Sequence, residues 1–307
     1  MIEVEALTKV YPGGVEAVKG ISFEVDPGEV FGLLGPNGAG KSTTVGMLTT
    51  TVTPTSGSAR LVGYDVANEP LAARAVSSVV FQEAVVDRSL SGRANLELHA
   101  NLWRTPRTRV GEIAHSFGLE ELLDRPVGTY SGGERRRLEI ARSLVSEPRV
   151  LFLDEPTVGL DPLIRHELLD MIAGLRSRGE LTLLLTTHYL DEAERLCDRV
   201  AIIHRGEIVA LDTPATLKAS LGSELVELRV DRDADNVLAR LREHGVEGPE
   251  AFSVGSTVTV PLTDRAAAAT LAEIEVLELP VSGISTRRPS LDDVYLRLTG
   301  GRLADAA

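Results

Sequence analysis

The stretch Gly35-Pro36-Asn37-Gly38-Ala39-Gly40-Lys41-Ser42-Thr43 decides the fold. It matches G-x-x-x-x-G-K-[ST], follows the apolar run Glu29–Leu34 and opens the helical pattern Thr43–Leu48, so the sequence predicts a strand, a loop and a helix in that order. Glycines let such a loop turn its N–H groups toward phosphate oxygens, and the helix N-terminus favours an anion. We therefore expect the loop to bind nucleotide phosphates, with Lys41 on the β- and γ-phosphates and Ser42 on Mg²⁺.

Outward from the loop, short apolar runs alternate with helical patterns, which indicates an α/β fold with a largely parallel sheet. Val150–Leu153, Leu181–Thr186 and Arg199–Ile203 are expected to be further strands of that sheet, buried on both faces. Ile2–Leu7 and Gly20–Val25 alternate apolar and polar residues instead, which is typical of an antiparallel sheet with one wetter face.

Two further regions differ in pattern from this core. Residues 88–148 are mostly helical, with apolar stripes at helical spacing, and are expected to be a helical insertion between strands. Residues 221–307 read as β-α-β-β-α-β followed by a last helix, an order that fits a small α+β domain of ferredoxin-like type. Within it we expect a strand at Glu224–Val230, a helix at Asp264–Ile274, and a last helix, Leu291–Leu298, with Ser290 and Asp293 spaced as its N-cap and N3 partner. We therefore expect a first domain at 1–220 and an accessory domain at 221–307.

Composition narrows the function. Among 307 residues, 32 Lys and Arg stand against 45 Asp and Glu, which gives a formal net charge of −13. Such an acidic chain is a poor candidate for sequence-independent nucleic-acid binding or for a polybasic membrane anchor. The single cysteine, Cys197, excludes an internal disulfide framework. The first residues have no basic and apolar signal pattern, and apolar runs fall far short of a bilayer span, so we expect neither a secretory signal nor a membrane helix.

A pair of acids ends the strand at Val150–Leu153. Adjacent residues on a strand point to opposite faces, so Asp154 and Glu155 can serve different roles. We expect Asp154 to hold Mg²⁺ and Glu155 to act as general base on the attacking water. Without a phosphate loop upstream, a solvated acidic turn before Pro156 would be the better interpretation.

The stretch Tyr130-Ser131-Gly132-Gly133-Glu134 precedes another helical pattern, Leu138–Val145. By itself it indicates either an anion-binding turn or a plain turn with an N-cap serine. Placed between the phosphate loop and the acidic pair, it resembles the signature of the ATP-binding subunit of an ABC (ATP-binding cassette) transporter. That family has Leu where this chain has Tyr130, and Gln where it has Glu134, which places an acid near the γ-phosphate of a partner's ATP. The following Arg135–Arg137 either offset this charge or form a solvated basic face.

The resemblance extends to four single positions. Tyr11 looks like the aromatic residue that stacks on adenine, although a core or edge tyrosine is the alternative. Gln82 resembles the glutamine that touches Mg²⁺ and the water and senses the helical insertion. Asp161 lies in a loop similar to the one that crosses the dimer interface, although Asp161-Pro162 could also simply begin the next helix. His188 resembles the histidine that contacts the γ-phosphate, with a structural histidine at a strand end as the alternative. With Lys41 and Glu155, the residues Gln82 and His188 form the catalytic set that the resemblance implies.

The family implies a RecA-like P-loop NTPase fold that binds ATP and Mg²⁺. Its phosphate loop and signature lie on opposite sides of one domain, so a second ATP-binding subunit, either an identical copy or a paralogue, must complete each site. The stretches 187–194, 206–210 and 290–300 look most like the drug-exporter branch, similar to daunorubicin-resistance ATPases that serve separate ABC-2 type permeases. We therefore expect a peripheral ATPase on the cytoplasmic face of the membrane that powers export of a drug-like or lipid-like substrate. The alternatives are a soluble non-transport ABC ATPase and a nucleotide-gated regulatory module.

Overall fold

The computed structural model describes residues 1–83, 85–175, 181–231, 233–246, 251–263 and 266–300. The chain forms two compact units, Met1–Ile208 and Val209–Ala307. The two units meet between Ile208 and Val209, before residue 220, where the sequence predicts that the ATP-binding domain ends. The boundary at residue 220 stays a prediction. In the described part of the chain, no helix is both long and apolar enough to cross a membrane.

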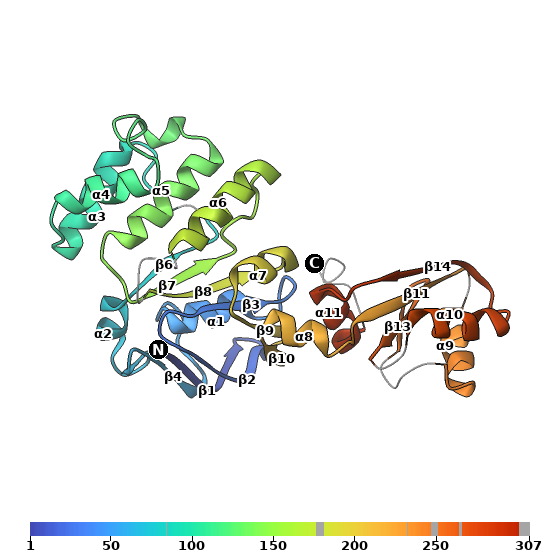
Figure 1. Ribbon diagram of the computed structural model, residues 1–307. Coiled ribbons are helices and arrows are strands. Elements are labelled where there is room, and N and C mark those ends of the chain that lie inside the picture. The colour runs from blue at the N-terminus through green and yellow to red at the C-terminus, as the bar shows by residue number, and fades with distance from the viewer. Residues whose placement is uncertain (84, 176–180, 232, 247–250, 264–265, 301–307) are drawn as a thin grey trace. The chain divides into compact units, whose positions relative to one another are not determined.

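A six-stranded sheet of order β10-β9-β3-β8-β7-β6 organises the first unit, which ends within the strand β10 (Figure 1). Its strands are β3 (Val30–Leu34), β6 (Ser77–Val80), β7 (Val150–Asp154), β8 (Thr182–Thr187), β9 (Arg199–His204) and β10 (Glu207–Asp212). β3 pairs in parallel with β8 and β9, and β7 pairs in parallel with β6 and β8. Every residue of β3, β7 and β8 is buried, which explains their near-continuous apolar sequences. Parallel strands bring their carboxyl ends to one edge, and the predicted site residues follow β3, β6, β7 and β8 there.

A second, antiparallel sheet carries the chain's N-terminal strands. It has the order β2-β1-β4-β5, built from β1 (Ile2–Tyr11), β2 (Val15–Val25), β4 (Ser56–Leu61) and β5 (Tyr64–Asp65). β1 and β2 extend beyond the predicted segments, because a tight turn at residues 12–14 lets both strands continue to their shared end. Helices α1 (Lys41–Leu48) and α2 (Pro70–Ala75) connect this sheet with the parallel one.

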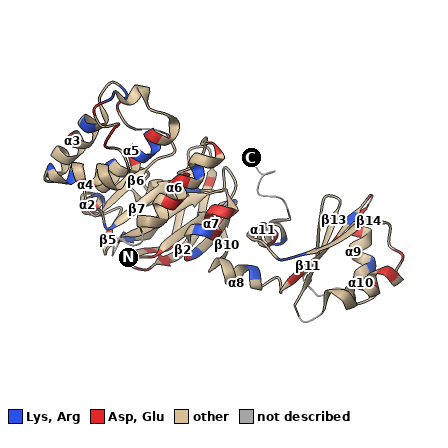
Figure 2. Ribbon diagram, turned by 45° about the horizontal axis from the view of Figure 1, so that its top comes forward, with Lys and Arg blue, Asp and Glu red and all other residues tan. Residues whose placement is uncertain are grey.

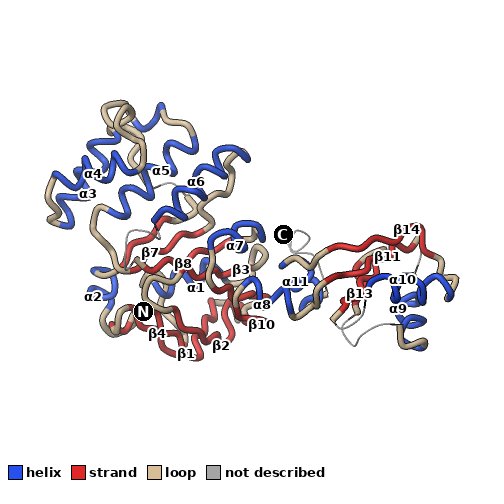
Figure 3. Tube along the Cα trace, viewed as in Figure 1, coloured by secondary structure: helices blue, strands red, loops and turns tan. Residues whose placement is uncertain are grey.

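The helical insertion predicted at 88–148 contains α3 (Gly92–Trp103), α4 (Thr108–Ser116) and α5 (Gly132–Leu144). These three helices contact one another, and α5 also contacts β6, whereas Figure 3 shows α3 and α4 away from the strands. The chain then continues through α6 (Pro162–Leu175) and α7 (Leu190–Leu196). Figure 2 shows both signs of charge on α6 and α7, where Arg165 pairs with Asp191 at 2.7 Å and with Glu192 at 2.9 Å.

The second unit follows the predicted β-α-β-β-α-β order. Its elements are α8 (Pro214–Ala219), β11 (Glu224–Val230), α9 (Ala234–Glu243), β12 (Phe252–Val254), β13 (Thr257–Leu262), α10 (Ala267–Val276), β14 (Val281–Arg287) and α11 (Leu291–Thr299). The strands form an antiparallel sheet of order β12-β13-β11-β14. Val226, Leu228 and Val230 alternate along β11 and join the core that α9 and α10 complete. The predicted start of α10 at residues 264–265 lies outside the described residues.

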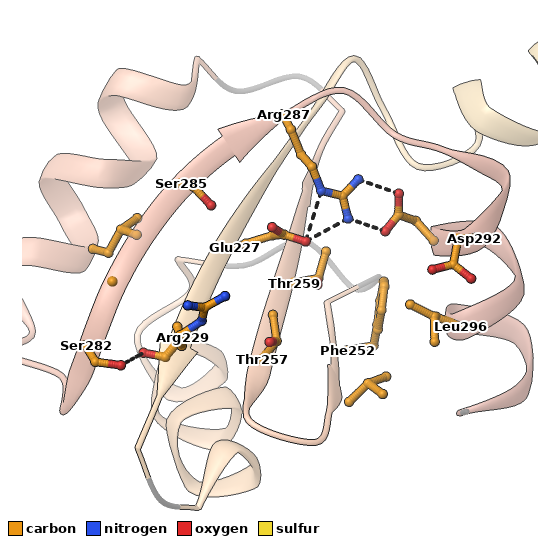
Figure 4. A pocket seen from close by; sticks show the side chains of 14 residues that line it. Glu227, Arg229, Phe252, Thr257, Thr259, Ser282, Ser285, Arg287, Asp292 and Leu296 are labelled. Carbon is orange, nitrogen blue, oxygen red and sulfur yellow. Dashed lines mark hydrogen bonds and ion pairs between the residues drawn. The ribbon is translucent and has the colours of Figure 1, made fainter. Parts of the chain in front are cut away.

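The opposite face of this sheet is polar. It borders a hollow of about 390 Å³, lined by Glu227 and Arg229 of β11 among others (Figure 4). Arg287 joins Glu227, at 2.7 Å, to the buried Asp293 of α11, at 2.5 Å. The Ser290 N–H donates to Asp293 at 2.8 Å, so the predicted Ser290–Asp293 cap is present at the start of α11.

Candidate active site

The phosphate-loop sequence lies between β3 and α1, where the carboxyl edge of the sheet meets a helix N-terminus. The Gly35 N–H donates to Thr187 O at 3.2 Å, and the Gly206 N–H donates to Ala39 O at 3.0 Å, so both sides of the loop are held. Gly40 adopts φ +107°, and a side chain there would come within 2.5 Å of the Ala17 carbonyl of β2. Only glycine combines this conformation with so close an approach, which explains the glycine spacing of the motif.

Lys41 is folded into the loop that precedes it. Its side chain is only 4% exposed, and its Nζ donates to Gly35 O at 2.7 Å and to Pro36 O at 3.0 Å. The same Nζ lies 3.1 Å from Oε1 of Glu155, whose side chain is 6% exposed. A buried cation whose remaining partner is a carboxylate can exchange that carboxylate for a phosphate oxygen.

Oxygen groups gather beside this ion pair. The Ser42 hydroxyl donates to Asp154 Oδ1 at 3.2 Å, and the Thr186 hydroxyl donates to the same oxygen at 2.5 Å. No group of three or more His, Cys, Asp or Glu side chains able to hold a metal forms among the described residues. One hydroxyl and one carboxylate suit Mg²⁺, which keeps several waters and completes its shell with substrate phosphates. Ser42 and Asp154 therefore fit the ion that the sequence predicts.

Glu155 stands in a strained backbone conformation. Its φ is +45°, in the left-handed region, which costs a non-glycine residue about 1–3 kcal/mol. Its N–H donates to the Thr186 hydroxyl at 3.0 Å. Nδ1 of His188 lies 3.4 Å from Glu155 Oε2 and has no hydrogen-bond partner among the described residues. The structure thus brings Lys41, Glu155 and His188 together, although the sequence separates them widely.

Among the described residues, neither Gln82 nor Tyr11 forms a hydrogen bond or ion pair with Lys41 or Glu155. Gln82 comes just after β6 and lines a hollow together with Gly132, Pro156 and Gly159. Within the described chain no hydrogen bond joins Gln82 to the pair Ser42 and Asp154. Tyr11 ends β1 with its ring half-buried, 5.1 Å from the Lys9 ammonium.

The signature forms the start of α5. Ser131 is its N-cap, with its hydroxyl accepting from Glu134 N at 3.2 Å while the Glu134 carboxylate accepts from Ser131 N at 2.6 Å. Glu134 thus completes a capping box, a role that the sequence interpretation missed although the Ser-x-x-Glu spacing is its signal. The helix consequently begins at Gly132. The apolar pattern alone predicts a start at Leu138. Asp161 caps α6 in a similar way, accepting from Ile164 N at 3.1 Å.

The structure corrects the interpretation of the basic run after the signature. Arg137 pairs with Glu167 of α6, and Arg135 donates to Tyr130 O. Arg136 is buried, and its guanidinium donates to backbone carbonyls beside the acidic pair. The sequence signal for this difference is the Arg136–Glu139 spacing, which places opposite charges on one helix face.

The chain is similar in sequence and structure to known ATP-binding proteins. The family model described as ABC transporter matches residues 18–158. The chain is 43% identical to the daunorubicin/doxorubicin resistance ATP-binding protein DrrA of Streptomyces peucetius, over 97% of this chain and 92% of that protein. It is 35% identical to the linearmycin resistance ATP-binding protein LnrL of Bacillus subtilis (strain 168), over 99% and 100%. The structure resembles cbiO1 of Clostridium perfringens, part of the ABC transporter complex cbiONQ, with a TM-score of 0.66, 28% identity and coverage of 79% and 94%.

A buried phosphate-loop lysine, an acidic pair after β7 and a signature helix in one α/β unit define an ATP-binding cassette, a class of P-loop ATPases. The chain belongs to the ABC transporter family and is one of its ATP-binding, ATP-hydrolysing subunits. This confirms the fold class and the family predicted from the sequence. The two alternatives, a non-transport ATPase and a regulatory module, find no support in these relatives.

Proposed function

We propose that this chain powers export of a hydrophobic drug-like or lipid-like substrate through a separate ABC-2 type permease. The observation that carries the ATPase part is the buried Lys41–Glu155 contact of 3.1 Å at the end of the phosphate loop. The export part is supported by relatives whose names record resistance to daunorubicin, doxorubicin and linearmycin. In this proposal the chain lies on the cytoplasmic face of the membrane, held there by the permease.

Each site residue has a role in this proposal. The loop amides and Lys41 bind the β- and γ-phosphates, replacing the Glu155 contact of Lys41. Glu155, released from the lysine, takes a proton from the attacking water, and His188 beside it orients the γ-phosphate. Ser42, Asp154 and Gln82 would hold Mg²⁺, which neutralises charge that develops on the phosphates. Tyr11 stacks on the adenine.

A second ATP-binding subunit completes each site in this proposal, as an identical copy or as a paralogue. The signature residues Ser131, Gly132 and Gly133 of one chain contact the ATP held by the phosphate loop of the other. Support comes from the start of α5 at Gly132, because the first N–H groups of a helix have no acceptor within the helix and can bind an anion. Glu134 is held by the N–H of Ser131 and therefore lies beside this contact. Asp161 lies in the loop that we assign to the interface.

We also propose that residues 1–220 are the ATP-binding domain and 221–307 an accessory domain of ferredoxin-like type. The strand order β12-β13-β11-β14 and its two covering helices support this assignment. Regulation of hydrolysis and stabilisation of the dimer are its two candidate roles. Deletion after Gly222, followed by ATPase and sizing measurements, separates them: altered hydrolysis with an unchanged dimer indicates regulation, and loss of the dimer indicates stabilisation.

Two measurements test the transport function. The purified chain should release phosphate from ATP, and Lys41→Ala should not, because the loop loses the cation that meets the phosphates. A tagged chain should recover an integral membrane protein from detergent-solubilised membranes of its own host. Phosphate release without recovery of any multi-span protein would count for a non-transport ATPase.

A further inference from the structure

Arg136 is a buried side chain of α5 that donates several hydrogen bonds. Its Nε donates to Pro156 O at 2.7 Å, and its Nη2 donates to Asp154 O at 3.2 Å and Glu155 O at 3.4 Å. One guanidinium therefore holds three successive carbonyl groups of the acidic pair and the residue after it. The planar fork of arginine suits several fixed acceptors at once, which a lysine ammonium does not match.

The same guanidinium reaches the segment that carries Gln82. Its Nη1 donates to Phe81 O at 2.6 Å and to Glu139 Oε2 at 3.0 Å. The other oxygen of Glu139 accepts from Val85 N at 2.8 Å. Arg136 and Glu139 thus hold the backbone on both sides of Gln82, at positions 81 and 85.

Burial makes this arrangement rigid. The side chains of Arg136 and Glu139 are 8% and 5% exposed, so neither charge has bulk water as an alternative partner. A buried pair of this kind keeps its geometry only while both charges are satisfied. The bond from Arg136 to Glu155 O is one of the contacts that support Glu155, whose left-handed backbone conformation needs support from its surroundings.

We propose that Arg136, with Glu139, is a positioning residue that ties the signature helix to the hydrolytic residues of the same chain. It sets the backbone of Glu155 and of Gln82 in register with the start of α5, where the partner's ATP binds. The proposal rests on the proposed function, since it assigns Arg136 to the arrangement of the general base. Arg136 itself acts through Glu155 and Gln82 and has no contact with the phosphates in this role.

The test replaces the guanidinium of Arg136 by an ammonium group, which keeps the positive charge but not the planar set of donors. Arg136→Lys leaves Glu139 paired but cannot reach all of the carbonyls. We expect kcat to fall at least tenfold while KM for ATP stays within about threefold, because the phosphate loop is untouched. The matched control is Arg137→Lys, the same change one residue along on a side chain that pairs with Glu167 of α6, and it should leave both constants within about twofold.

Amide hydrogen exchange supplies a readout that does not depend on activity. Arg136→Lys should speed exchange at least tenfold at Glu155, Val158 and Val85, whose amides lie in the two held segments, and Arg137→Lys should not. Equal exchange and equal kcat in the two variants would overturn the proposal, and so would a KM that rises by as much as kcat falls. An inactive wild-type chain would instead refute the proposed ATPase, while the exchange comparison still decides the role of Arg136.

If Arg136→Lys does not fold, a second variant still tests the proposal. The double change Arg136→Gln with Glu139→Gln removes both charges together, so no unpaired charge is left buried. We expect it to fold and to show the same loss of kcat with a nearly constant KM. Wild-type kcat in a folded double variant would also refute the positioning role.

Discussion

Replacing the proposed general base tests the centre of the site. Glu155→Gln keeps the shape of the side chain but removes its charge from Lys41, 3.1 Å away. At an effective dielectric constant near 20 that attraction is about 5 kcal/mol before the cost of desolvation. Lys41 keeps its two carbonyl partners, and the amide oxygen can accept a third bond. The net loss of folding stability without nucleotide should therefore be about 2 kcal/mol, below the usual 3–5 kcal/mol for breaking a buried pair.

The same change should act in the opposite direction on ATP binding. In the wild type, ATP must displace Glu155 from Lys41, whereas glutamine offers a weaker competitor and does not repel the γ-phosphate. We expect ATP to bind at least about threefold more tightly, and the closed dimer to accumulate. Hydrolysis should fall by a factor of about 10² to 10⁴, the usual contribution of a general base.

Three assays separate these effects. Thermal unfolding of the nucleotide-free chain should shift down by about 4–8 °C, the ATP-induced upward shift should grow, and phosphate release should be lost. Glu29→Gln is the matched control, because Glu29 is another buried glutamate, 3.3 Å from Arg199 and away from the phosphate loop. It should lower stability while leaving hydrolysis and the ATP-induced shift unchanged. Undiminished phosphate release by Glu155→Gln would refute the assignment of the base.

Three further predictions concern pH, the second unit and the loop. Burial, with a nearby arginine, lowers the pKa of His99 from 6.5 to about 4, so the unfolded chain binds more protons between these values. Stability should fall by about 1–2 kcal/mol as pH drops from 6.5 to 4, after discounting for solvent at this half-buried ring, and His99→Gln should flatten that part of a urea-unfolding pH profile. Arg287→Met should destabilise the second unit by about 2 kcal/mol, because Asp293 is 1% exposed and keeps only its cap donors; a calorimetric transition unchanged by the substitution would contradict this. Gly40→Ala should weaken ATP binding more than tenfold, since its added carbon meets a backbone carbonyl at 2.5 Å, whereas Gly38→Ala, with open space around it, should weaken binding less in the same titration.

Local signals in the sequence were strong where a residue's conformation depends on its neighbours in the chain. The strand at Glu224–Val230 has the predicted bounds, because alternation along a half-buried strand is visible in seven residues. The phosphate loop was equally easy to predict, because Gly38 and Gly40 adopt positive φ angles that a local backbone turn requires. The start of α5 was predicted six residues too late, because a polar capping box, and not an apolar stripe, begins that helix.

By itself, the sequence determined the family, the phosphate loop and the acidic pair, because these features depend on residue type and spacing along the chain. Only the tertiary structure decided which distant groups meet. It places Glu155 beside Lys41. It also shows that Arg136, which the sequence left as a candidate for a solvated basic face, is buried and bonded to the backbone after the acidic pair. The physical reason is that parallel strands gather their ends at one edge regardless of chain separation, and that burial of a charge depends on what packs against it.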